Sequence, residues 1–125
     1  MKRIQKLQND IKKWSDETFG MYRTGLPIAH HLKKETDEVI DAISTLHQGI
    51  YTNGTREDGI KKLSDAHKRV LFELTDCLTL VMDIAAHEGI TMEQLIDASF
   101  TKLEINKKRK WGEPDENGVV EHIHE

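Results

Sequence analysis

Residues 31–43 read HLKKETDEVIDAI, an amphipathic helical pattern that acidic side chains interrupt. At about 100° per residue, the apolar side of a helix over residues 28–46 consists of Ile28, Leu32, Val39, Ile43 and Leu46. Glu35 falls inside this stripe, and Glu38, three residues later on the same face, lies at its edge. Because an unpaired carboxylate in a core is costly, the pattern predicts that a cation or a proton neutralises these side chains.

A second stretch, residues 71–85, reads LFELTDCLTLVMDIA and repeats the arrangement. Its predicted apolar stripe consists of Val70, Leu74, Cys77, Val81 and Ile84. Glu73 lies within the flank of this stripe, and Asp76 borders it. Carboxylate oxygens are the ligands that Mg²⁺, Mn²⁺ and Ca²⁺ prefer, so the two acidic pairs together predict a divalent cation site. Asp83, two turns beyond Asp76, is expected at a solvated helix position, with an extension of the site as the alternative.

The composition limits the classes of protein to consider. A chain of 125 residues is most simply one domain, and a hydrophobic content of 37% makes burial against a partner chain plausible. The formal net charge of −4 argues against a general binder of nucleic acids or anionic membranes. Cys77 is the single cysteine and is expected to be a small core residue. Without an apolar run of about 20 residues, we expect a soluble, cytoplasmic protein with no membrane span.

Helical signals cover most of the chain. Helices are predicted at residues 1–18, about 28–46, from 57 or 60 to 87, and from 91 to about 110. The segment 49–55 contains two glycines and an Asn-Gly step, which indicate a loop. From Gly112 onwards the chain is rich in Gly, Pro, Asp, Glu and Asn taken together. The sequence therefore predicts an all-α domain at residues 1–111 and an extended tail at residues 112–125.

The last predicted helix carries positive charge. Lys102, Asn106 and Arg109 follow one another at i, i+4 and i+7, which places them on one helix face. Two cations and an amide on one face are suited to phosphate oxygens. A solvated basic helix end, favourable for the helix dipole, is the alternative interpretation.

Four motifs together resemble a known family. They are Trp14-Ser15-x-x-Thr18-Phe19-Gly20, His31-Leu32-x-Lys34-Glu35-x-x-Glu38, Glu73-x-x-Asp76, and Lys102-Leu103-x-Ile105-Asn106-x-x-Arg109-x-Trp111-Gly112. In this order they resemble the MazG-like all-α nucleoside triphosphate pyrophosphohydrolases. The chain looks most like a subgroup that is common in phages and prophages and is linked to dATP and dGTP. The gap between Glu38 and Glu73 is longer than the family's usual one, so residues 47–60 are expected to reshape the mouth of the pocket.

The resemblance implies an activity and a metal site. It implies the hydrolysis of purine deoxynucleoside triphosphates to a nucleoside monophosphate and pyrophosphate, with Mg²⁺ or Mn²⁺ as cofactor. The metal ligands implied are Glu35, Glu38, Glu73 and Asp76. The catalytic carboxylates implied are Glu38 and Glu35, and Glu38 is the better placed of the two to orient or deprotonate the attacking water.

The resemblance also implies the remaining contacts and the assembly. Lys102, Asn106 and Arg109 are expected to bind the phosphates. Trp14 is expected to stack on the base, with ordinary core packing as the alternative, and His31 to touch base or sugar. A bundle of four to five helices would be completed by a homotetramer or homodimer, in the host cytoplasm if a phage encodes the chain.

Two other classes of protein share part of this pattern. A ferritin-like di-iron bundle needs Glu-x-x-His pairs on two helices, and the single match, Glu121-x-x-His124, lies in the tail. A non-enzymatic helical interaction module would carry the acidic pairs as ordinary helix surface. This module is the alternative that the sequence leaves open.

Overall fold

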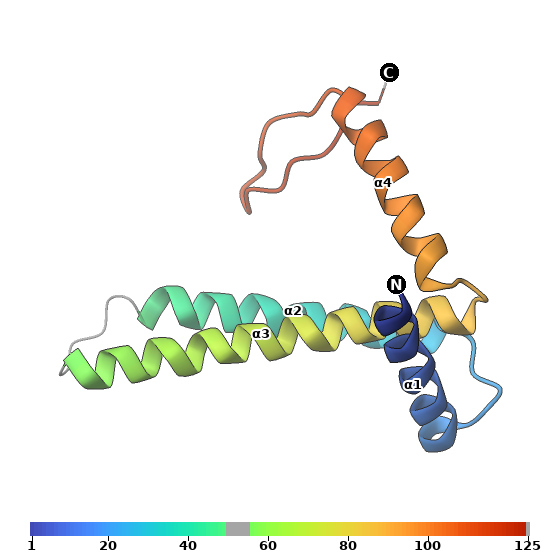
Figure 1. Ribbon diagram of the computed structural model, residues 1–125. Coiled ribbons are helices and arrows are strands. Elements are labelled where there is room, and N and C mark those ends of the chain that lie inside the picture. Colours follow the sequence, from blue (N-terminus) through green and yellow to red (C-terminus); the bar gives the residue numbers. More distant parts are fainter. Residues whose placement is uncertain (50–55, 125) are drawn as a thin grey trace. The chain divides into compact units, whose positions relative to one another are not determined.

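The computed structural model describes residues 1–49 and 56–124 and confirms the all-α prediction. Its helices are α1 (Lys2–Phe19), α2 (Gly25–Gly49), α3 (Arg56–His87) and α4 (Met92–Lys108) (Figure 1). Each predicted helix is present, and α2 is three residues longer at either end than the apolar pattern indicated. Most of the predicted loop 49–55 lies outside the described residues. None of the four helices is long and apolar enough to cross a membrane.

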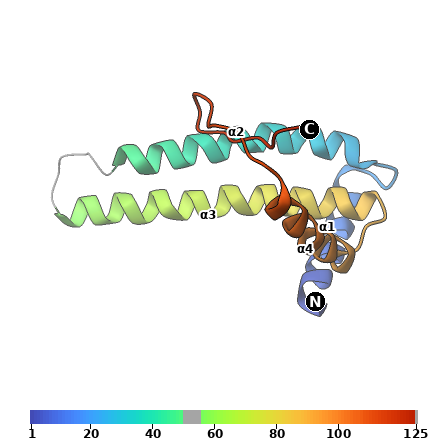
Figure 2. The same ribbon diagram turned by 90° about the horizontal axis from the view of Figure 1, so that it is seen from above.

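The chain divides into two compact units, Met1–Met92 and Glu93–Glu125, which are described separately. In the first unit α2 and α3 lie side by side and antiparallel, and α1 packs on the C-terminal part of α3 (Figures 1 and 2). The predicted stripe of α2 is confirmed, because Ile28 is buried and the other four members are half-buried. The buried apolar residues of this unit are Ile28, Ala42, Met82, Ala85 and Met92.

The predicted stripe of α3 needs a correction. Leu74 is 49% exposed and Val81 is 36% exposed, whereas Met82 and Ala85 are buried. The reason is that α3 contacts two helices, α2 along its length and α1 near its C-terminal end, so two different sides of α3 are covered. A single stripe with a helical period describes only one such side.

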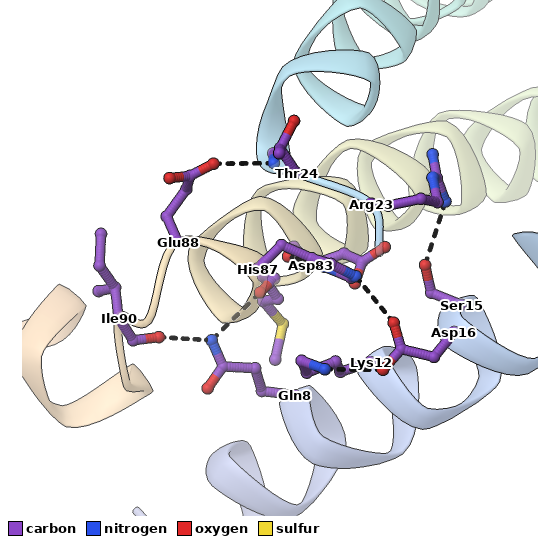
Figure 3. Close-up of polar contacts among 12 residues, drawn as sticks. Gln8, Lys12, Ser15, Asp16, Arg23, Thr24, Asp83, His87, Glu88 and Ile90 are labelled. Carbon is purple, nitrogen blue, oxygen red and sulfur yellow. Dashed lines mark hydrogen bonds and ion pairs between the residues drawn. The ribbon is translucent and has the colours of Figure 1, made fainter. Parts of the chain in front are cut away.

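Polar side chains join α1 to the end of α3. The buried side chain of Gln8 donates hydrogen bonds from Nε2 to the carbonyl oxygens of Met82 (3.1 Å) and Ile90 (3.0 Å) (Figure 3). Glu88 accepts a hydrogen bond of 2.8 Å from the backbone N–H of Gly25, the first residue of α2. A carboxylate at this end of a helix is stabilised by the unpaired N–H groups there. These contacts hold α1 and the start of α2 against the last turns of α3.

The second unit contains α4 and the tail, which is not simply extended. Trp111 and His122 form an isolated antiparallel bridge, and the N–H of Gly112 donates to the carbonyl of Glu121 at 2.9 Å. The carboxylate of Asp115 accepts hydrogen bonds from the N–H groups of Asn117 (2.8 Å) and Val119 (2.9 Å). The tail folds back on itself because Asp115 satisfies the backbone of a tight turn through its own side chain.

Candidate functional site

Three of the four predicted carboxylates lie together. Glu35 from α2 and Glu73 and Asp76 from α3 each offer an oxygen, and these oxygens lie within 4.8 Å of one another. The antiparallel packing of α2 on α3 brings the two acidic pairs to the same level, and the i, i+3 spacing turns Glu73 and Asp76 to the same side of α3. Glu35 and Glu73 are half-buried, and Asp76 is exposed. We call these three residues the carboxylate group.

The carboxylate group gathers negative charge. Burial raises the pKa of Glu73 above its ordinary value of 4.5, and the neighbouring charges of Asp76, Glu38 and Glu35 raise it further, in that order, against a small opposing effect of Arg69. Desolvation likewise raises the pKa of the half-buried Cys77 thiol, again with help from these carboxylates. Three oxygen ligands with excess negative charge are the donor set of a hard divalent cation, so the residues fit Mg²⁺ or Mn²⁺.

Glu38 lies apart from the carboxylate group. Its side chain is 52% exposed, and its Oε2 lies 3.7 Å from Nη2 of Arg69 on α3. Its charge nevertheless contributes to the raised pKa of Glu73, so Glu38 borders the group from the solvent side. This position agrees with its predicted place at the edge of the apolar stripe.

A cavity of about 320 Å³ adjoins the carboxylate group. Its walls come from α1, α2, α3 and the α1–α2 connection, and are formed by Trp14, Phe19, Arg23, Ile28, His31, Glu35, Asp76, Thr79, Leu80 and Asp83. The predicted base or sugar contacts, Trp14 and His31, therefore line the same cavity as Glu35 and Asp76. The described part of the predicted insertion, at residues 47–49 and 56–60, does not line it.

The aromatic side of the cavity is ordered by contacts between its own residues. Trp14 and Phe19 pack edge to face with ring centroids 5.4 Å apart, and the guanidinium of Arg23 lies 4.7 Å from the centre of the Phe19 ring. Nη1 of Arg23 also donates to Oγ of buried Ser15 at 3.2 Å. His31 Nε2 lies 3.0 Å from Glu35 Oε1, which links the ring to the carboxylate group. Trp14 is exposed, so its ring is accessible and is not ordinary core.

Sequence reasoning did not place Arg23 in the site, and it gave Asp83 only as an alternative extension of the site. Arg23 belongs to the short connection between α1 and α2, where a lone cation gives no periodic signal. Asp83 was expected at a solvated position, and this prediction is wrong, because Asp83 is only 4% exposed. The cause is α1, which covers this side of α3. The amphipathic pattern of α1 indicates that it packs on something, but it does not indicate where.

The three predicted phosphate-binding residues lie in the second unit, on α4 and just after it. Oδ1 of Asn106 accepts a hydrogen bond of 3.1 Å from Nη1 of Arg109, and the carbonyl of Asn106 accepts one of 3.0 Å from the indole N–H of Trp111. Lys102 is exposed. Partial burial lowers the pKa of His122, and the positive charges of Arg109 and Lys102 lower it further. Lys102 and Arg109 therefore bring positive charge to the surroundings of His122.

One protein family matches the chain. The sequence model of that family, described as dATP/dGTP pyrophosphohydrolase, matches residues 49–125, which is more than half of the chain. The match includes Glu73, Asp76 and the predicted phosphate-binding residues, and it begins after the positions of Glu35 and Glu38. No curated protein and no solved structure matches the chain.

Proposed function

The chain belongs to the dATP/dGTP pyrophosphohydrolase family, and from this premise we propose that the cavity beside the carboxylate group is its active site. The chain is accordingly an enzyme that hydrolyses a nucleoside triphosphate to a nucleoside monophosphate and pyrophosphate, not a non-enzymatic interaction module. The observation that carries the site proposal is the meeting of Glu35 from α2 with Glu73 and Asp76 from α3, since Glu35 and Asp76 also line one cavity.

The carboxylate group is proposed to hold Mg²⁺ or Mn²⁺. Support comes from the all-oxygen donor set and from the raised pKa of Glu73, which burial and the neighbouring charges of Asp76, Glu38 and Glu35 cause. When bound, the cation neutralises charge on the triphosphate and lowers the pKa of a coordinated water. The task of Glu35, Glu73 and Asp76 is to fix the position of this charge at the wall of the cavity.

Glu38 and Glu35 are the proposed catalytic carboxylates. Glu38 would orient the water that attacks the α-phosphorus and would accept its proton, while the bond between the α-phosphorus and the bridging oxygen breaks and pyrophosphate leaves. Glu38 can turn toward the cavity because its contact with Arg69 is long, 3.7 Å, and exposed, and such surface pairs contribute little stability. Glu35 is held by His31 and supplies a fixed oxygen beside the reacting phosphate.

The proposed contacts with the base, the sugar and the phosphates follow from the chemistry of the side chains. Trp14 offers an exposed ring for stacking on a purine, the larger of the two base types, which favours dGTP or dATP as substrate. His31 would touch the base or the sugar. Lys102, Asn106 and Arg109 would bind phosphate oxygens, as their shared face and positive charge suggest.

A homotetramer or homodimer is proposed as the oligomeric state of the active enzyme. Large apolar side chains of the two long helices are exposed in the single chain, namely Ile40, Leu71, Phe72, Leu74 and Leu78. An apolar surface of this kind along two adjacent helices is typical of an interface between protein chains. Burial of these residues against a second copy would supply the core that a chain of modest hydrophobic content lacks.

The proposal is tested by pyrophosphate release and by metal binding. We expect the protein to release pyrophosphate from dGTP and dATP with Mg²⁺ or Mn²⁺, and the metal alone to raise the melting temperature, because a ligand that binds only the folded state stabilises it. Glu35→Gln, Glu73→Gln and Asp76→Asn should abolish most of both effects. Asp41→Asn, an exposed carboxylate of α2 outside the group, is the matched control and should leave both unchanged.

A separate variant tests the role of Glu38. Glu38→Gln should lower kcat by roughly 10²- to 10⁴-fold, the range for loss of a general base, while the metal still raises the melting temperature. Near wild-type turnover in two or more variants of the carboxylate group would show that the metal site has been placed wrongly. Near wild-type turnover in Glu38→Gln alone would remove only its assignment as the base.

A further inference from the structure

Asp83 is a buried carboxylate without a complete set of partners. It is 4% exposed, lines the cavity, and its Oδ1 makes no hydrogen bond among residues 1–49 and 56–124. The nearest ring nitrogen, Nδ1 of His87, lies 3.0 Å from this oxygen but also 2.9 Å from the carbonyl oxygen of Asp83 itself, to which it is hydrogen-bonded. This ring nitrogen is thus shared with a backbone carbonyl, and because a carboxylate can accept several hydrogen bonds, Asp83 keeps acceptor capacity for a donor from a molecule bound in the cavity.

The position of Asp83 is fixed by its surroundings. The His87 side chain is 2% exposed, and its Nε2 lies 3.0 Å from Oδ1 of Asp16 on α1 (Figure 3). Asp16 in turn accepts a hydrogen bond of 2.7 Å from Nζ of Lys12 through its other oxygen. The ring is therefore held between α1 and α3, and the Asp83 carboxylate beside it is held in place before any ligand arrives. Such preorganisation suits a recognition group.

The distance along α3 indicates which part of a nucleotide reaches Asp83. Asp83 follows Asp76 by two helical turns, which is about 10 Å along the axis. If the phosphates lie at the carboxylate group, the 3′-hydroxyl is too close to them to span this length, because only the 5′-oxygen and three sugar carbons separate it from the α-phosphorus. The far edge of the base is the part that extends far enough. Trp14, in the same cavity wall, is available to hold the face of that base.

We propose that Asp83 accepts hydrogen bonds from the Watson–Crick edge of the base and that this contact favours guanine over adenine. The inference rests on the proposed function of the cavity. An ionised carboxylate only accepts hydrogen bonds. Guanine presents two adjacent donors on this edge, N1–H and the 2-amino group, whereas adenine presents one donor and an acceptor, N1, which a carboxylate repels. The substrate class that fits Asp83 best is therefore a guanine nucleoside triphosphate.

The test compares kcat/KM for dGTP, dATP and dITP, which is dGTP without the 2-amino group. We expect the unaltered protein to prefer dGTP over each of the other two by roughly tenfold or more, the discrimination of one good bidentate contact. Asp83→Asn keeps the shape but adds a donor, so it should lose the preference over dITP and shift the dATP-to-dGTP ratio toward dATP. A carboxylate that merely supports His87 would not produce this exchange of base preference.

Asp16→Asn is the matched control, because it alters the other carboxylate beside His87 and Asp16 does not line the cavity. It should leave the ratios among the three substrates unchanged. The substrate comparison on the unaltered protein needs no variant and stands even if Asp83→Asn does not fold. Equal kcat/KM for dGTP, dITP and dATP in an active enzyme would overturn the role of Asp83 alone. An absence of pyrophosphate release from every triphosphate would overturn the proposed site and this inference with it.

Discussion

Replacing Gln8 by alanine should destabilise the first unit far more than a surface substitution on the same helix. Gln8 is 2% exposed and is a polar residue of α1 that contacts the end of α3. Its Nε2 donates to the carbonyls of Met82 and Ile90, and its Oε1 accepts a hydrogen bond of 2.6 Å from Nε2 of Gln5. The variant removes all three hydrogen bonds at once and leaves a void between the two helices.

The expected loss can be worked from these contacts. Each of the two hydrogen bonds to backbone carbonyls contributes about 1 kcal/mol. The carbonyl of buried Met82 also loses a hydrogen-bond donor, which adds to the cost. Deletion of the side-chain atoms leaves a small cavity, which adds roughly 1 kcal/mol. The total is about 3 kcal/mol in the free energy of unfolding, which corresponds to a fall of roughly 10 °C in melting temperature for a chain of this size.

Urea unfolding followed by circular dichroism measures this loss. Two further variants separate its parts. Gln8→Met keeps the volume and loses the hydrogen bonds, so it should cost about 1–2 kcal/mol. Lys6→Ala, which removes an exposed ion pair with Asp10 on the same helix, should cost under about 0.5 kcal/mol. If Gln8→Ala and Lys6→Ala proved equally stable, the packing of α1 on α3 described here would be refuted.

Three more outcomes are expected. Glu88→Ala should lower the free energy of unfolding by about 1 kcal/mol, because it removes the carboxylate that caps α2. Gly25→Ala should also destabilise the fold, because the added Cβ would lie 2.7 Å from Glu88 Oε1 and displace this carboxylate. Unchanged urea midpoints in both variants would contradict this reasoning. Without metal, Glu73→Gln should be more stable than the unaltered protein at neutral pH. The difference in free energy of unfolding between the two proteins should shrink as the pH falls toward 4.5, because a carboxyl whose folded-state pKa is raised destabilises the fold only when it is ionised. A difference that does not change with pH would count against the raised pKa of Glu73. Light scattering should report a dimer or tetramer, and a 14.4 kDa species active at nanomolar dilution would exclude the proposed assembly.

The sequence predicted the helices and all three members of the carboxylate group because both depend on local spacing. Glu73 and Asp76 share a face by helical geometry alone, and Glu35 meets them because two successive amphipathic helices commonly pack antiparallel. The burial of Asp83 could not be predicted, since it depends on where α1 crosses α3. The hydrogen bond between Gly25 and Glu88 likewise could not be predicted, because it joins residues far apart in the sequence and helical periodicity describes only neighbours within one helix.

The fold of the tail, residues 112–124, also could not be predicted from its composition. Its content of Gly, Pro, Asp, Glu and Asn suggested an extended chain. One carboxylate, that of Asp115, makes two hydrogen bonds to the backbone and turns the segment back on itself. Composition describes which regular structures a segment avoids, whereas a turn of this kind depends on a single residue at the right position.

The antiparallel pair α2 and α3 has a consequence for how this protein can vary. Glu35 lies roughly four turns before the end of α2, and Glu73 nearly five turns after the start of α3, so the carboxylate group lies far from the connection between the two helices. Matched additions or deletions at that end would lengthen or shorten both helices without altering the pairing at Glu35 and Glu73. The facing ends of α2 and α3 are therefore the part of the first unit whose length can change while Glu35, Glu73 and Asp76 stay together.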